Sequence, residues 1–146
     1  MPDVSLYWFR DDLRLVDLPG LSAAASRGPV VPVYIRDTRL GGEWKIGGAS
    51  QWWLHHSLDQ LTRDLNTLGV PLILRSGDTQ TILLQLAEEA GASQVYCSRQ
   101  YQPWAGELER AIHDALEARG IALKRYPGTL LHEPEHISTG SGTPFK

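Results

Sequence analysis

The sequence predicts an α/β protein with a doubly wound, five-stranded parallel sheet, Rossmann-like, in three α/β/α layers. Five short apolar runs rich in β-branched residues recur along the 146 residues, and segments with the spacing of amphipathic helices lie between them. The run at residues 30–35 is apolar on both faces, which is typical of a parallel strand covered by helices on both sides.

The expected strands are all too short to be read as helices. They comprise residues 4–9, 30–35, 71–74, 94–97 and 121–126. The clearest helix between them carries leucines in steps of four and three, which align on one face. These leucines are Leu54, Leu58, Leu61, Leu65 and Leu68. Similar stripes at residues 82–90 and 108–115 predict two further helices, and Gly69, Gly91 and Gly120 follow the three patterns as C-terminal caps.

After Tyr126 the regular pattern ends, because prolines and glycines divide residues 127–146 into turns. We therefore expect one α/β domain over residues 1–130. Residues 131–146 are expected to begin a linker to a further domain.

The composition is that of an ordinary globular domain, with 42% hydrophobic and 21% charged residues. With a net charge of −3, the chain lacks the excess of positive charge that binding nucleic acid over its whole surface requires. The single cysteine, Cys97, lies in an apolar run and is expected in the core, and no leader or membrane span is visible, so we expect a cytoplasmic protein with no membrane partner.

No catalytic or metal-binding constellation is predicted. His55 and His56 are adjacent rather than four residues apart, and His113, His132 and His136 form no ligand cluster in sequence. Neither a nucleophile elbow nor a glycine-rich phosphate loop is present.

Polar residues follow four of the expected strands, at the sheet edge where open parallel sheets bind ligands. Arg10 follows the first strand, Asp37 the second, Arg75 and Ser76 the third, and Gln100 and Tyr101 the fourth. Charged residues are common where strands meet solvent, so a purely surface role is the alternative. We prefer a ligand site in which Arg10 and Asp37 make charge-assisted contacts.

The glycine-rich segment 41–50 precedes the long helix and allows two interpretations. It is a flexible connector with Ser50 as helix cap, or a flap that contains Gly47 and places Trp44 over a planar ligand. Of the five tryptophans, Trp8 is expected in the core. Adjacent Trp52 and Trp53 point about 100° apart, so one is expected in the core, and the other, with Trp44 and Trp104, faces a ligand or a partner domain.

Several ordered motifs resemble those of the DNA photolyase and cryptochrome family. The stretch Trp8-Phe9-Arg10-Asp11-Asp12-Leu13-Arg14-Leu15 is similar to the opening W-F-R-x-D-L-R-L of that family. The stretch Gly48-Ala49-Ser50-Gln51-Trp52-Trp53-Leu54-His55-His56 looks most like bacterial class I cyclobutane pyrimidine dimer photolyases. Further matches reach Thr143-Pro144-Phe145-Lys146, so the resemblance covers nearly the whole chain.

The resemblance implies an α/β domain that holds an antenna chromophore, methenyltetrahydrofolate or a deazaflavin, near Arg10, Asp37, Trp44, Gly47, Gln100 and Tyr101. A C-terminal helical domain, absent from this chain, would carry FAD and bind damaged DNA. The parent protein would be a deoxyribodipyrimidine photo-lyase, a carbon–carbon lyase that repairs pyrimidine dimers with light, and the isolated domain would be inactive.

Two alternatives remain open. One is the N-terminal domain of a cryptochrome blue-light photoreceptor, which shares this domain with the photolyases and differs mainly in the rest of the protein. A free-standing nucleotide-binding α/β protein is the other alternative, although the missing phosphate loop disfavours it.

Overall fold

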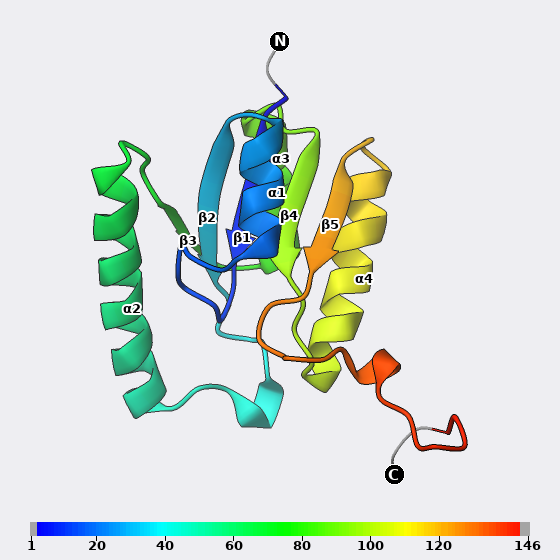
Figure 1. Ribbon diagram of the computed structural model, residues 1–146. Coiled ribbons are helices and arrows are strands. Elements are labelled where there is room, and N and C mark those ends of the chain that lie inside the picture. Colours follow the sequence, from blue (N-terminus) through cyan, green and yellow to red (C-terminus); the bar gives the residue numbers. More distant parts are fainter. Residues whose placement is uncertain (1–2, 144–146) are drawn as a thin grey trace.

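The computed structural model describes residues 3–143 and has the predicted fold, a five-stranded parallel sheet with helices on both faces (Figure 1). The strand order is β3-β2-β1-β4-β5. The strands are β1 (Ser5–Phe9), β2 (Val30–Arg36), β3 (Ile73–Ser76), β4 (Gln94–Ser98) and β5 (Ala122–Tyr126). Because β1 lies at the centre and the chain winds outward in both directions from it, the strand order reverses there, which is the usual place for a ligand crevice.

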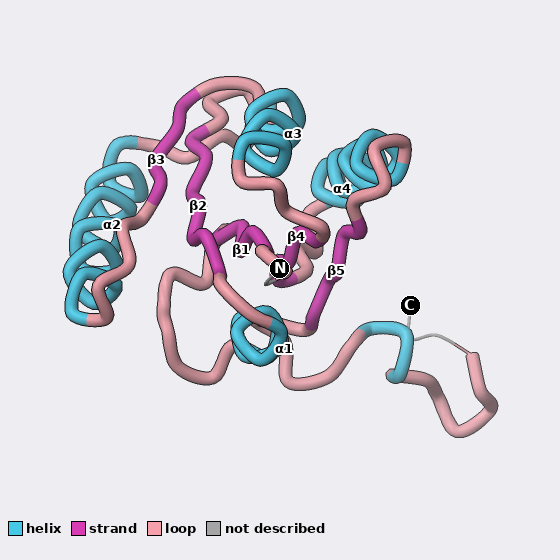
Figure 2. The backbone as a smooth tube through the Cα atoms, turned by 90° about the horizontal axis from the view of Figure 1, so that it is seen from above, coloured by secondary structure: helices cyan, strands magenta, loops and turns pink. Residues whose placement is uncertain are grey.

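The described residues form four helices around the sheet. They are α1 (Pro19–Arg27), α2 (Gly48–Thr67), α3 (Thr79–Glu89) and α4 (Pro103–Glu117), and two short 3-10 turns are η1 (Gly42–Trp44) and η2 (Pro134–His136). Viewed along the strands, α3 and α4 lie on one side of the sheet, α1 lies on the other, and α2 stands beside edge strand β3 (Figure 2). None of the described helices is both long enough and apolar enough to cross a membrane.

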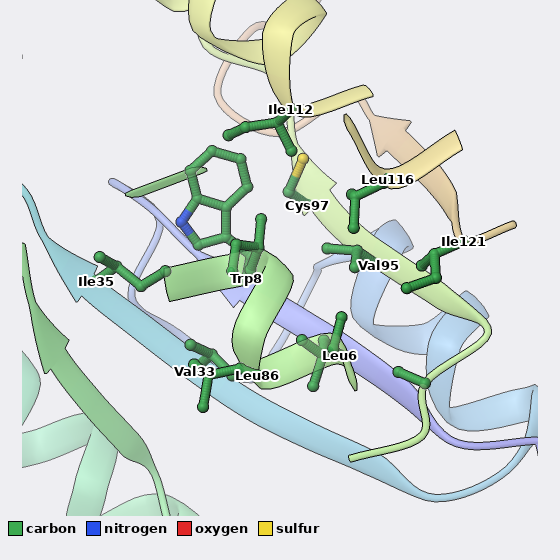
Figure 3. Packing of buried hydrophobic residues seen from close by; sticks show 13 residues of the cluster. Leu6, Trp8, Val33, Ile35, Leu86, Val95, Cys97, Ile112, Leu116 and Ile121 are labelled. Carbon is green, nitrogen blue, oxygen red and sulfur yellow. The ribbon is translucent and has the colours of Figure 1, made fainter. Parts of the chain in front are cut away.

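Alternating side chains of β1 divide the core into two halves. Leu6 and Trp8 pack with α3 and α4, where Figure 3 shows Trp8 near Ile112 and Cys97. Tyr7 and Phe9 face the other way and pack with residues of α1 and α2. Trp8 and Cys97 are buried, as expected.

Helix α1 is not among the helices that the apolar spacing predicts. Its buried residues are the small Gly20 and Ala24, so it has no stripe of large side chains. A Cβ placed on Gly20 would lie 3.3 Å from the ring of Tyr126, which shows how closely this helix approaches β5. The absence of a side chain at Gly20 therefore allows the packing that hides the helix from a search for apolar periodicity.

Strand β3 begins two residues later than expected. Pairing with β2 starts at Ile73, opposite Val33, and continues to Ser76, opposite Arg36. Pro71 has no N–H to donate to a ladder, which favours the later start. Arg75 and Ser76 therefore belong to the strand rather than to the loop after it.

Helix α2 differs from the sequence-based expectation in three details. It begins at Gly48 with Gly47 as the N-cap, so Ser50 lies inside the helix and is not the cap. Trp52 and Trp53 are both exposed, at 62% and 70%, so neither is the expected core residue. Leu61 and Leu65 are the buried members of the leucine stripe, because α2 contacts the sheet mainly through its C-terminal half.

Beyond Tyr126 the described chain contains only turns and η2, as the prolines and glycines predict. Arg99 holds this segment through ion pairs with Glu133 and Glu135. Of the expected linker, residues 144–146 lie outside the described part of the chain.

Candidate functional site

A cavity of about 420 Å³ opens at the carboxyl ends of β1 and β2, beside the point where the strand order reverses. Its walls come from the ends of these strands, from the η1 segment with the first turns of α2, and from the start of α4. The lining includes Arg10, Asp37, Trp44, Gln100, Gln102 and Trp104. The volume falls within the roughly 300–1,000 Å³ of small-molecule sites.

Arg10 is a buried cation at the end of β1. Its Nη1 donates to a carboxylate oxygen of Glu109 and to the backbone oxygen of Ser98, 3.3 Å away. The guanidinium carbon lies 4.3 Å from the ring centroid of Trp8. Residues of β1, β4 and α4 therefore hold Arg10 in one place, and it lines the cavity from there.

Glu109 on α4 is the buried counter-charge of Arg10 and was not singled out from the sequence. Burial opposes its ionisation, but hydrogen bonds from Arg125 and Arg10 outweigh burial and lower the pKa of Glu109 below its ordinary value. The signal that could have found it is positional. The buried residues of α4 are Ala105, Glu109, Ile112 and Leu116, so a carboxylate occupies one position of an otherwise apolar stripe.

Asp37, just after β2, has a side chain that is only 1% exposed. Its Oδ1 accepts hydrogen bonds from the backbone N and Nε of Arg39, and its Oδ2 accepts from Arg39 and from the N–H and hydroxyl of Thr79. The bonds from Arg39 hold the pKa of Asp37 well below its ordinary value, although burial opposes the shift. Both carboxylate oxygens are thus already engaged by the protein.

Trp44 ends η1 and is 81% exposed, yet it lines the cavity. Its indole face is therefore available to a bound molecule. Gly47 does not itself line the cavity, but Ile46 and Gln51 on either side of it do. The side-chain amide of Gln51 donates to the backbone oxygen of Ile46 at 3.1 Å and fixes the junction between the loop and α2.

Gln100 lines two neighbouring cavities, whereas Tyr101 lines only one of them. Gln100 lines the 420 Å³ cavity and donates through Nε2 to Asp11, at 2.6 Å. Tyr101 lines an adjacent cavity of about 240 Å³, and its hydroxyl donates to Glu133 at 2.7 Å. Burial and this bond to a carboxylate raise the pKa of Tyr101 to about 12. The structure therefore brings Arg10, Asp37, Trp44 and Gln100 together and places Tyr101 next to them.

Within residues 3–143, one group of possible metal ligands brings its atoms within 4.8 Å of one another, namely His113, Asp114 and Glu117. All three are exposed on α4 and none lines the 420 Å³ cavity. Arg36 and Lys45 add positive charge to that cavity, and Asp11 adds negative charge. The cavity thus offers aromatic faces, amides and charges of both signs.

The family model described as DNA photolyase matches residues 5–146. The deoxyribodipyrimidine photo-lyase of Agrobacterium fabrum is 43% identical over 97% of this chain and 29% of its own length. Cryptochrome-1 of Arabidopsis thaliana is 38% identical, with 97% of this chain and 21% of its own length covered. Each relative is thus more than three times as long as the matched region.

The chain is also similar to solved structures of photolyases. A class III photolyase from Agrobacterium tumefaciens superimposes with a TM-score of 0.90 at 42% identity, covering 99% of this chain and 30% of that one. An archaeal photolyase from Sulfolobus tokodaii, described with two FAD molecules and a novel light-harvesting cofactor, has a TM-score of 0.83 at 26% identity over 93% of this chain and 32% of that one. The structural similarity includes a class III enzyme, whereas the sequence motifs were likened to class I.

Proposed function

Because the chain belongs to the DNA photolyase family, we propose that it is the light-harvesting domain of a larger photolyase and binds an antenna chromophore in the 420 Å³ cavity. The α/β domain comprises residues 1–130, and residues 131–146 begin the linker to a C-terminal helical domain. That domain carries FAD and binds damaged DNA, and the whole protein repairs pyrimidine dimers. Methenyltetrahydrofolate and a deazaflavin are the candidate chromophores.

The observation that carries this proposal is the cavity at the carboxyl ends of β1 and β2, with the exposed indole of Trp44 at its wall. Both candidate chromophores are planar heteroaromatic molecules, and an indole face stacks on such rings. The amide of Gln100 and the charges of Arg36 and Lys45 suit polar substituents and a negatively charged tail. The lining therefore fits either chromophore.

Each proposed site residue has a distinct part. Trp44 stacks on the ring system, while Arg10 and Gln100 contact its polar edge. Asp37 holds the loop after β2 through Arg39 and Thr79, since its oxygens are already engaged. Gly47 forms the junction at the start of α2, and Tyr101 closes the neighbouring cavity against Glu133.

An antenna chromophore, when bound, absorbs light and passes the excitation energy to a flavin. The protein then has to hold the chromophore in position, which requires no acid, base or nucleophile. A cytoplasmic location, favoured by the lone buried thiol of Cys97, is part of the same proposal.

A cryptochrome photoreceptor is the second candidate, because Cryptochrome-1 of Arabidopsis thaliana matches almost the same share of the chain as the Agrobacterium photo-lyase does. The two candidates share the cavity and differ in what the rest of the protein does. A DNA-repair assay on the full-length gene product separates them.

The direct test is to titrate the chain with methenyltetrahydrofolate and with 8-hydroxy-5-deazariboflavin, following the absorption of each. We expect saturable binding of one of them, weakened about tenfold or more by Trp44→Ala, since stacking on an aromatic ring contributes about 1–3 kcal/mol. Trp52→Ala is the matched control, because Trp52 is also exposed but does not line the cavity. Binding of neither compound, or equal losses in the two variants, would overturn the proposal.

A further inference from the structure

Glu109 connects three parts of the molecule through one buried carboxylate. Its Oε1 accepts from Nη1 of Arg10, after β1, and from the backbone N–H of Gln100, after β4, at 3.3 Å. Its Oε2 accepts from Nη1 of Arg125 on β5, at 2.8 Å. Arg10 and Gln100 line the 420 Å³ cavity, but Glu109 does not.

The two arginines that bind Glu109 differ in exposure. The side chains of Arg10 and Glu109 are 3% and 2% exposed, whereas that of Arg125 is 48% exposed. A buried guanidinium without a counter-charge is costly, so Arg10 depends on Glu109 for its position. Arg125 can be solvated instead and does not reach the cavity.

We propose that Glu109 is a positioning residue of the chromophore cavity, setting ligand affinity by holding Arg10 and the Gln100 backbone without touching the ligand. This inference rests on the proposed function. The same carboxylate orients a cation at the end of β1 and the amide at the start of the β4 loop. A change at Glu109 therefore alters two walls of the cavity together.

Glu109→Gln keeps the size of the side chain but removes its charge, so Arg10 loses its counter-charge. We expect chromophore binding to weaken about tenfold, as for loss of a hydrogen bond between charged groups. Arg125→Met is the matched control, because it removes the other bond to the same carboxylate. We expect it to change affinity less than twofold, whatever it does to stability.

A double-mutant cycle with Arg10→Met separates positioning from general support of the fold. If Glu109 acts through Arg10, Glu109→Gln weakens binding less in the Arg10→Met background than in the wild-type chain. The inference would be overturned if Glu109→Gln weakened binding by the same factor in both backgrounds. It would also be overturned if Glu109→Gln left the affinity unchanged. Wild-type chain that binds neither methenyltetrahydrofolate nor 8-hydroxy-5-deazariboflavin would overturn the proposed function first, and this inference with it.

Should Glu109→Gln fail to fold, the variant Arg10→Met/Glu109→Leu replaces the buried pair with apolar side chains, a change that folds often tolerate. We expect its circular dichroism and cooperative unfolding to match the wild-type chain while chromophore binding is at least tenfold weaker. Wild-type affinity in this folded variant would contradict a positioning role.

Discussion

Thr79, the first residue of α3, donates both its backbone N–H and its hydroxyl to Oδ2 of Asp37, at 3.0 and 3.2 Å. Asp37 follows β2 and lies 42 residues earlier in the chain. A carboxylate at a helix N-terminus also interacts favourably with the helix dipole. These bonds attach the loop after β2, which forms part of the cavity, to the start of α3. Helix α3 lies on the opposite side of the sheet from α1 (Figure 2).

We predict that Asp37→Ala lowers the free energy of unfolding by about 3 kcal/mol, because buried donors of Thr79 lose a charged acceptor. Asp78→Ala provides the comparison, since Asp78 caps the same helix through Thr81 but is partly exposed. Loss of that cap should cost only about 1 kcal/mol. Urea unfolding of both variants measures the difference, and equal losses would show that Asp37 is no more than a second cap.

The stability of the chain should decrease in acid. Hydrogen bonds from Arg39 hold the pKa of Asp37 below its ordinary value, and bonds from Thr81 and Arg39 lower that of Asp78 to about 2. In the unfolded chain both groups protonate near pH 4. Their contribution is therefore fully present above about pH 4 and is lost as the pH falls from there toward the native pKa values.

Asp37→Asn should make this acid dependence shallower, because an asparagine side chain does not titrate. Urea unfolding at intervals between about pH 2.5 and pH 7 measures the slope for both proteins. The same slope in wild type and variant would mean that Asp37 does not carry the effect. In that case Asp78 and Glu109, whose pKa values are also lowered, would account for it.

The strands and the three helices with leucine or alanine-leucine stripes could be predicted because their apolar residues follow the periods of buried strands and helices. Helix α1 could not, since Gly20 and Ala24 bury too little area to mark a face. Trp52 and Trp53 show the opposite error, because large apolar residues suggest burial while α2 stands beside the edge of the sheet (Figure 1). Periodicity reports which face is apolar and not what covers it.

The site could be predicted in part, from the positions at which the strands end. Strand ends identify Arg10, Asp37 and Gln100, because parallel strands bring their carboxyl ends to one edge. The partners that hold these residues come from distant elements, as Glu109 does from α4 and Thr79 from α3. No local pattern in the sequence specifies such pairings, apart from the charge within the apolar stripe of α4.

The stability of the chain should also decrease in alkali, because the unfolded chain loses protons from groups that the native chain keeps protonated. Burial raises the pKa of the Cys97 thiol to about 12, and burial likewise raises that of Tyr7 to about 12. In the unfolded chain these groups ionise near pH 8.5 and pH 10. The native protein keeps them protonated, so its stability is full below those values and is lost as the pH rises toward about 12.

Between about pH 8.5 and pH 10, Cys97 should contribute most of this loss, so Cys97→Ala should flatten the unfolding free energy in that interval. The variant is less stable at neutral pH because a buried side chain becomes smaller, but the slope and not the absolute value is the measurement. An unchanged slope would show that the thiol of the native chain ionises as readily as that of the unfolded chain.

Substitution by alanine should change the stability of the chain in opposite directions at two of its glycines. Gly106 is exposed within α4, and a Cβ there would meet no heavy atom within 4 Å. Gly106→Ala should stabilise the chain by about 0.5–1 kcal/mol, because alanine loses less backbone entropy in a helix. A Cβ on Gly128 would instead lie 2.7 Å from Cβ of Ser98 and 3.1 Å from Oδ2 of Asp12.

Gly128→Ala should therefore destabilise the chain by about 1–3 kcal/mol, as expected when a side chain is forced into a packed site. Ser98 is at the end of β4 and its hydroxyl lies 3.3 Å from that of Tyr7, so the displaced side chain disturbs a buried polar contact. Urea unfolding of both variants at neutral pH measures the two signs. Stabilisation by Gly128→Ala would mean that the segment after β5 does not pack against Ser98 and Asp12 in solution.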